Sequence, residues 1–174
     1  GNGITSMPIH YDPNIHHRRS IRLKGYDYSQ AGAYFVTICT QDRVCLLAHI
    51  VDGVVELTPA GCMVEQVWDE VPQYYPGIET DAFVVMPNHI HGILVWAEAH
   101  GELSLPDVVH RLKSLTTALY RHAVVQKNWT PFPGRLWQRN YYEHIIRDEA
   151  DLDRIRQYIA ANPLKWVSDD LYPS

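Results

Sequence analysis

Two histidines, His89 and His91, stand one residue apart in the apolar segment VVMPNHIHGILVW, residues 84–96. Side chains alternate between the two faces of a strand, so we expect both imidazoles on one face and the apolar Ile90 and Ile93 on the other. Two neutral imidazoles placed in this way could bind one divalent metal ion. The chain has 10 histidines, so such a pair also arises by chance, and two half-exposed histidines on the wet face of a sheet are the alternative.

A second candidate group lies near the C-terminus, in a helix expected over 148–163. Arg154, Tyr158 and Asn162 follow one another at intervals of four residues and therefore share one face of that helix. The tyrosine could supply a nucleophilic phenol, and the amide one turn later a third metal ligand. Each residue also has a structural alternative, because Tyr158 could be an aromatic residue on the helix flank and Asn162 a C-terminal cap before Pro163.

Taken together, these groups suit the transfer of a phosphodiester. A phenol with a pKa of about 10 is a poor nucleophile at neutral pH, but a bound metal ion would polarise the phosphate and stabilise the leaving oxygen. Attack by tyrosine would leave a covalent phosphotyrosine, so the broken strand could be rejoined without ATP. Two histidines and one amide carry no charge, so we expect weak metal binding without DNA, and Mg²⁺ or Mn²⁺ rather than structural zinc.

The elements that must position these groups follow from hydrophobic patterning. We expect a hairpin with its turn at Asp52-Gly53, and a helix that begins after the N-cap Thr58 and ends near 74–77. The remaining expected elements are strands over 32–41, 80–87, 89–96 and 140–148, and helices over 104–125 and 148–163. This order predicts an α+β, ferredoxin-like fold, with a four-stranded antiparallel sheet, helices on one face and an additional C-terminal helix. The histidines should face the open side of the sheet.

Length and composition favour one globular domain, with 174 residues of which 46% are hydrophobic and 20% charged. No apolar run approaches the roughly 20 residues of a membrane span, and no secretory signal is visible. The three cysteines form no paired motif, which favours reduced thiols in a cytoplasmic protein. We expect a tail over 1–15, one domain over 16–166 and a tail over 167–174. Met7 is a candidate natural start, which would make 1–6 a cloning remnant.

Basic residues gather in two tracts although the net charge is −5. The segment HHRRSIRLKG carries four basic residues and no acid, and 111–147 carries seven basic residues against one acid, Glu143. A fold could bring both tracts onto one nucleic-acid-binding face, or they could be ordinary solvated surface.

At three separated segments the chain resembles a known family: RRSIRLKGYDYSQAGAYFVTICTQDR, MPNHIHGIL and WQRNYYEHIIRDEADLDRIRQYIAANPLKW. These segments are similar to the REP-associated tyrosine transposases, which are domesticated relatives of single-strand insertion-sequence transposases in the HUH endonuclease superfamily. The resemblance runs from about His16 to Trp166. It implies the ferredoxin-like sheet, a divalent metal ion, and cleavage and rejoining of single-stranded DNA through a 5′-phosphotyrosine.

The resemblance also implies residue roles. His89 and His91 would be the HUH histidines, with Tyr158 as nucleophile and Asn162 as the further metal ligand. The neighbouring tyrosines at 141 and 142 fall on the expected fourth strand, and we therefore assign them to packing or DNA contact.

Family members bind short palindromic hairpins beside a single-stranded tetranucleotide, which implies hairpin or single-stranded DNA as partner. Trp137 could stack on a base or lie buried. The final helix could complete its own site or that of a partner subunit, in a monomer or a homodimer. The side chains expected to contact phosphates are Arg18, Arg19, Arg22, Lys24, Arg111, Lys113 and Arg139.

Two other functions stay open at this point. One is a nucleic-acid-binding module on the same sheet without chemistry. The other is a metallohydrolase in which His89 and His91 activate water.

Overall fold

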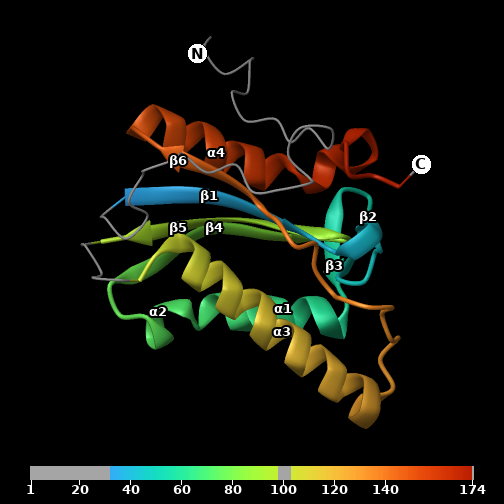
Figure 1. The fold of residues 1–174 in the computed structure, drawn as a ribbon. Coiled ribbons are helices and arrows are strands. Elements are labelled where there is room, and N and C mark those ends of the chain that lie inside the picture. Colours follow the sequence, from blue (N-terminus) through green and yellow to red (C-terminus); the bar gives the residue numbers. More distant parts are fainter. Residues whose placement is uncertain (1–31, 98–102, 174) are drawn as a thin grey trace.

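The computed structural model describes residues 32–97 and 103–173 (Figure 1). Four strands form one antiparallel sheet in the order β4-β5-β1-β6. Helical connections link β1 to β4 and β5 to β6, and in each case one other strand lies between the two linked strands. This is the ferredoxin-like order. The predicted α+β fold is therefore confirmed. The strands of this sheet are β1 (Gly32–Cys39), β4 (Ile78–Met86), β5 (His89–Trp96) and β6 (Tyr142–Ile146).

Helices lie on both faces of the sheet. The helices α1 (Pro59–Asp69), α2 (Val71–Tyr74) and α3 (Leu105–Lys127) are on one side, and α4 (Glu149–Ala161) runs along the other (Figure 1). The chain then continues into a 3-10 helix, η2 (Pro163–Ser168).

The expectation that the histidines face an open side is wrong, because α4 covers that face. The apolar stripe of α4, Ile155 and Ile159, packs against Phe35 of β1 and Ile93 of β5, and all four side chains are at most 2% exposed. The expectation for Ile93 is also wrong: strict alternation along β5 places residue 93 on the same face as the histidines.

Local signals fixed several element ends. The hairpin of β2 (Ala48–Val51) and β3 (Val54–Leu57) turns at Asp52 and Gly53, which have φ of 51° and 75°, as a two-residue hairpin turn requires. The predicted N-cap of α1 is confirmed, since the Thr58 hydroxyl accepts from the N–H of Gly61 at 3.0 Å.

The first predicted helix is interrupted, and two other elements differ in extent. Pro72 lacks an N–H and cannot continue a helix from α1, so α2 starts afresh at Val71. A short 3-10 helix, η1 (Gln41–Arg43), follows β1, and β6 pairs only over 142–146 rather than over the predicted 140–148.

The C-terminal chain beyond 166 packs on the sheet instead of leaving it. Leu171 is 1% exposed and belongs to the same apolar cluster as Ile155 and Ile159. The predicted boundary at 166 stays a prediction. In the part of the chain that the structure describes, no helix is both long and apolar enough to cross a bilayer.

Candidate active site

His89 and His91 lie together on the face of β5 that α4 covers. Their ring centroids are 4.6 Å apart, and the side chains are 0% and 1% exposed. Both imidazoles therefore point the same way, as predicted. Their burial is incompatible with a pair of half-exposed histidines on a wet face.

Hydrogen bonds orient both rings through Nδ1. Asn88 Nδ2 donates to the carbonyls of Arg43 and Leu171, so its Oδ1 accepts from His89 Nδ1 at 2.8 Å. His89 Nδ1 therefore carries the proton, and Nε2 presents a lone pair. His91 Nδ1 is 2.7 Å from the Thr37 hydroxyl, across the β1–β5 pair.

The end of α4 brings Tyr158 and Asn162 to the same place within a single chain. The Tyr158 ring centroid is 5.4 Å from that of His91 and 6.0 Å from that of Phe35. Asn162 is 3% exposed, and its Nδ2 donates to the carbonyl of Tyr158 at 3.1 Å. Asn162 is thus the C-cap residue of α4, as one alternative proposed, while its Oδ1 remains available to a ligand.

The donor atoms fit a metal ion. His89 Nε2, His91 Nε2 and Asn162 Oδ1 are buried and have no hydrogen-bond partner within the described chain. The two imidazoles are neighbours, and the Asn162 side chain acts on the pKa of both, so the three atoms lie together. Buried polar atoms normally have partners, so this group marks a candidate binding site. Among the described residues no cluster of three or more His, Cys, Asp or Glu could hold an ion, so a metal here needs the amide oxygen.

Electrostatics keep the histidines neutral and the tyrosine protonated. Burial lowers the pKa of His91 to about 3 and that of His89 well below its usual range. Burial, then the carboxylate of Asp169, raises the pKa of the Tyr158 phenol, although the Asn162 side chain opposes this. Neutral imidazoles are ready to bind a metal, whereas the phenol needs nearby positive charge before it can attack.

Polar contacts fix α4 over the sheet. Arg156 forms a bidentate pair with Asp81 of β4, at 2.8 and 2.7 Å, and His144 of β6 lies 2.8 Å from Asp151. The Asp148 side chain caps the helix by accepting from the N–H of Asp151 at 2.8 Å. Contacts to strands on both sides of the histidines therefore set the position of Tyr158.

Comparison with known proteins shows to which family this chain belongs. The family described as "Transposase IS200 like" matches residues 63–162, more than half of the chain, and this range includes both histidines, Tyr158 and Asn162. This chain belongs to the IS200-like transposases. The resemblance found in the sequence is thereby confirmed.

Individual proteins and one solved structure are similar to this transposase. A Haemophilus influenzae protein of uncharacterized function is 40% identical over 185 residues, with 95% of this chain and 99% of that protein covered. A REP-associated tyrosine transposase of Escherichia coli K12 is 28% identical over 142 residues, covering 80% of this chain and 72% of the relative. A REP-associated tyrosine transposase solved with a REP hairpin has a TM-score of 0.59 and 25% identity, covering 83% of this chain and 73% of that one.

The other candidate aromatic residues of this transposase are packing residues. Tyr141 and Tyr142 are each 7% exposed. Tyr142 lies on the histidine face, with its ring 6.0 Å from Phe35, and burial followed by Asp151 raises the pKa of its phenol to about 12. Trp137 is 5% exposed and donates from Nε1 to the Thr116 hydroxyl at 2.8 Å, so it is not an open stacking platform.

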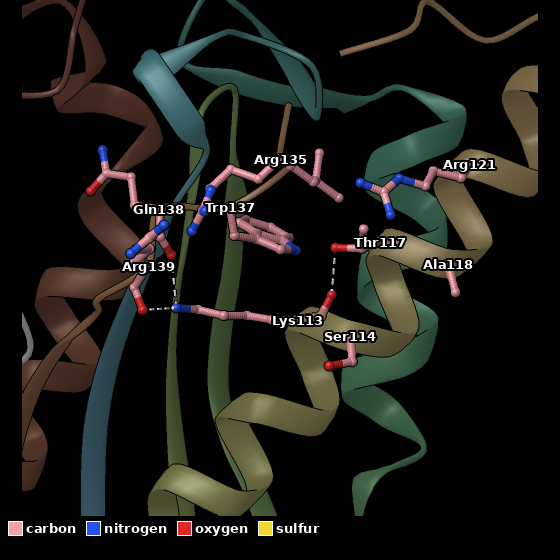
Figure 2. A pocket seen from close by; sticks show the side chains of 10 residues that line it. Lys113, Ser114, Thr117, Ala118, Arg121, Arg135, Trp137, Gln138 and Arg139 are labelled. Atoms are coloured by element: carbon pink, nitrogen blue, oxygen red, sulfur yellow. Dashed lines mark hydrogen bonds between the residues drawn. The ribbon is translucent and has the colours of Figure 1, made fainter. Parts of the chain in front are cut away.

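A basic groove of about 480 Å³ lies between α3 and the segment 135–139 (Figure 2). Four of the described residues that line it are cationic and none is acidic; they are Lys113, Arg121, Arg135 and Arg139. Lys113 and Arg139 were among the phosphate contacts expected from the sequence, whereas Arg121 and Arg135 were not. Both missed residues belong to the basic tract of 111–147, and only folding showed that they share a groove.

The side chains predicted to contact phosphate differ in the contacts that they make within the protein. Lys113 Nζ donates to the carbonyls of 138 and 139 at 2.8 and 3.0 Å (Figure 2). It also donates to the carbonyl of 140 at 3.2 Å, so it holds the groove wall. Arg111 does not line the groove, and its guanidinium lies 3.6 Å above the Tyr74 ring. Four predicted contacts, Arg18, Arg19, Arg22 and Lys24, lie outside the described residues.

Proposed function

We propose that this transposase cleaves and rejoins single-stranded or hairpin DNA through a 5′-phosphotyrosine on Tyr158, with Mg²⁺ or Mn²⁺ bound by His89, His91 and Asn162. The observation that carries the proposal is the convergence of three partnerless buried donor atoms beside the ring of a helix-borne tyrosine. The family supports the class of reaction, and the geometry supports the proposed residue roles.

The bond changes balance as a transesterification. The Tyr158 oxygen forms a bond to phosphorus, the bond from phosphorus to the 3′ oxygen breaks, the phenol loses its proton and the 3′ oxygen gains one. A bound divalent ion would polarise the phosphate and stabilise the charge on the leaving oxygen. Rejoining is the reverse reaction, with a 3′ hydroxyl attacking the phosphotyrosine.

The chain contributes position and protonation. Asn88 and Thr37 hold the two imidazoles in fixed orientations, and α4 fixes the phenol next to them within the same chain. The rings of Phe35 and His91 flank the half-buried Tyr158 ring, and this limits the access of water to the attacking group, which favours strand transfer over hydrolysis.

We infer that the substrate is a REP-like palindrome with a single-stranded flank. A structural relative is bound to a REP hairpin, and the basic groove offers a phosphate-binding surface on a chain of net charge −5. Exposed Arg135 and Arg139 would contact the backbone there, while Lys113 would shape the groove.

The test is covalent trapping on a panel of 3′-labelled REP-type hairpins with single-stranded flanks, incubated with Mg²⁺ or Mn²⁺. The label should migrate with the protein on a denaturing gel for the native chain. It should also do so for the control variant Tyr142→Phe, which removes a different phenol on the same face of the sheet. Tyr158→Phe should give no adduct while retaining hairpin binding.

The other outcomes separate the rival functions. Strand cleavage that persists in Tyr158→Phe would mean that water is the nucleophile, as in a metallohydrolase. Hairpin binding without an adduct from the native chain would indicate a binding module without chemistry.

A further inference from the structure

The turn formed by residues 169–172, which follows η2, lies at the rim of the histidine site. On this turn, Oδ2 of Asp169 is 3.9 Å from His89 Nε2. The N–H of Tyr172 donates to the Asp169 carbonyl at 3.0 Å, so both residues belong to one hydrogen-bonded turn. Side chains that this turn carries or contacts are therefore next to the site that Tyr158 shares.

Aromatic rings lead from the buried histidines to the surface at this rim. The Trp166 ring is 8% exposed, and its centroid lies 6.1 Å from that of His89. The Tyr172 ring packs against Trp166 with centroids 5.2 Å apart and planes inclined at 70°, yet Tyr172 is 40% exposed. Trp166 thus supports the Tyr172 ring from one side and leaves part of it open to solvent. Unpaired nucleobases stack on aromatic side chains placed in this way.

Arg43 brings a positive charge to the same turn. The residue is exposed, and its Nη1 donates to the Asp170 carbonyl at 3.3 Å. The Arg43 carbonyl accepts from Asn88 Nδ2 at 3.2 Å, and Asn88 also orients His89, so the arginine is tied to the site. This one hydrogen bond leaves the guanidinium with further N–H groups that can donate to a phosphate.

Negative charge near the phenol gives this cation a role. Burial, then the Asp169 carboxylate, raise the pKa of the Tyr158 phenol, the Asn162 side chain opposes them, and Asp170 adds a smaller increase. The same two carboxylates would repel a DNA phosphate that approaches Tyr158. A guanidinium at the rim offsets that repulsion.

We propose that Arg43 and Tyr172 hold the single-stranded flank of the DNA at this rim. The Arg43 guanidinium binds a backbone phosphate of the flank, and an unpaired base beside that phosphate stacks on the Tyr172 ring. The inference rests on the proposed function, because it assigns one part of that substrate to two residues beside the reacting groups. The paired stem would bind elsewhere, at the basic groove.

The experiment compares two REP-type hairpins, one with a single-stranded flank and one without, in binding titrations with Mg²⁺. All variants are made in the full chain carrying Tyr158→Phe, so that no adduct forms. Tyr172→Ala should lower affinity for the flanked hairpin at least about fivefold and leave the flankless hairpin unaffected. Tyr172→Phe keeps the ring and should bind both normally. Tyr74→Ala, the matched control, removes a 58% exposed ring from α2 on the other face of the sheet and should also bind both normally.

Arg43→Gln tests the phosphate contact. It should weaken binding of the flanked hairpin alone and lower the slope of log affinity against log salt by about 0.7, the value for one contact with a single strand. Lys127→Gln removes the same charge from the end of α3 and should leave the slope for the flanked hairpin unchanged. Equal loss of affinity for both hairpins in Arg43→Gln or Tyr172→Ala would overturn the inference.

A fluorescent base separates stacking from a structural role of Tyr172. 2-Aminopurine placed along the flank should lose fluorescence on binding to the chain with Tyr172 or Tyr172→Phe and keep it with Tyr172→Ala. Quenching that is the same in all three at every flank position would show that no base stacks on this ring.

The covalent adduct of the native chain distinguishes failure of this inference from failure of the proposed function. If the adduct forms while Arg43→Gln and Tyr172→Ala bind the flanked hairpin normally, these residues do not hold the flank and the proposed function stands. If the native chain forms no adduct and binds both hairpins equally, the proposed function is wrong and the inference falls with it.

Discussion

At the scale of single residues, the site depends on partners that touch no substrate. The Thr37 hydroxyl fills the Nδ1 side of His91, which leaves Nε2 to face the site. Hydrogen-bond partners behind a metal-binding imidazole set its tautomer and orientation. Thr37 and His91 are direct cross-strand neighbours, so the sheet register itself aligns them.

Thr37→Val should weaken metal binding and stability together. Valine keeps the shape but leaves His91 Nδ1 without a partner in a buried place, at a cost of about 1–3 kcal/mol in the free energy of unfolding. We expect Mn²⁺ affinity, measured by calorimetry, to fall about 10–100-fold. Thr37→Ser retains the hydroxyl and should bind Mn²⁺ almost normally; equal affinity in the serine and valine variants would contradict this role for the hydroxyl.

At the scale of elements, the placement of α4 is the decisive feature. Its apolar stripe packs on β1 and β5, but a stripe alone does not fix rotation or sliding of a helix. The polar contacts of Arg156 with Asp81 and of His144 with Asp151 restrict both, and thereby set where Tyr158 points.

Stability should fall in acid through these same contacts. Burial by itself would raise the pKa of Asp151, but the hydrogen bond and charge of His144, with help from Arg147 and Arg154, hold it below its usual value. A lowered folded pKa stabilises the fold above the unfolded value of about 3.9 and loses that effect as pH falls through the folded value.

Asp151→Asn should therefore cost about 1–3 kcal/mol in the free energy of unfolding near pH 7. The difference from the native chain should shrink as pH falls below about 4, as measured by urea unfolding across pH. Asp153→Asn changes a carboxylate that is 66% exposed and should behave like the native chain. A difference between native and Asp151→Asn that grows in acid would reverse the assigned sign.

At the scale of the whole molecule, cationic residues gather in one groove although the net charge of the chain is negative. The chain is acidic overall, yet every charged residue among the described residues that line the groove between α3 and 135–139 is a cation. The segment 135–139, which forms one wall of the groove, is also hydrogen-bonded to the strand beside the histidines. The N–H of Gln138 donates to the Cys39 carbonyl, and Cys39 pairs with His89, so groove and site are about two strand spacings apart.

Arg135→Gln and Arg139→Gln should each weaken binding of REP-type hairpins in a salt-dependent way. A lost phosphate contact lowers the slope of log affinity against log salt by about 1, which binding titrations at several salt concentrations would measure. Lys127→Gln removes the same charge outside the groove and should leave the slope almost unchanged. A slope that is the same in all three variants would place the DNA elsewhere.

The sequence by itself determined most of the elements and the residue pairs that we propose for the chemistry. Alternation marked β5, helical spacing marked α4, and Thr58 and Asp52-Gly53 marked local ends, because each of these signals lies within a few neighbouring residues. The pairing of His89 with His91 and of Tyr158 with Asn162 was readable for the same reason, since strand and helix periods place these residues on common faces.

Only the tertiary structure decided which groups meet. That α4 covers the histidine face, that Thr37 supports His91, that Asp169 faces His89, and that Arg121 and Arg135 share a groove all depend on contacts between distant segments. Such contacts arise from the packing of whole elements and leave no periodic trace in the sequence around each residue. A short-range pattern can therefore indicate candidate reacting groups, whereas the contacts between distant segments decide which residues surround them.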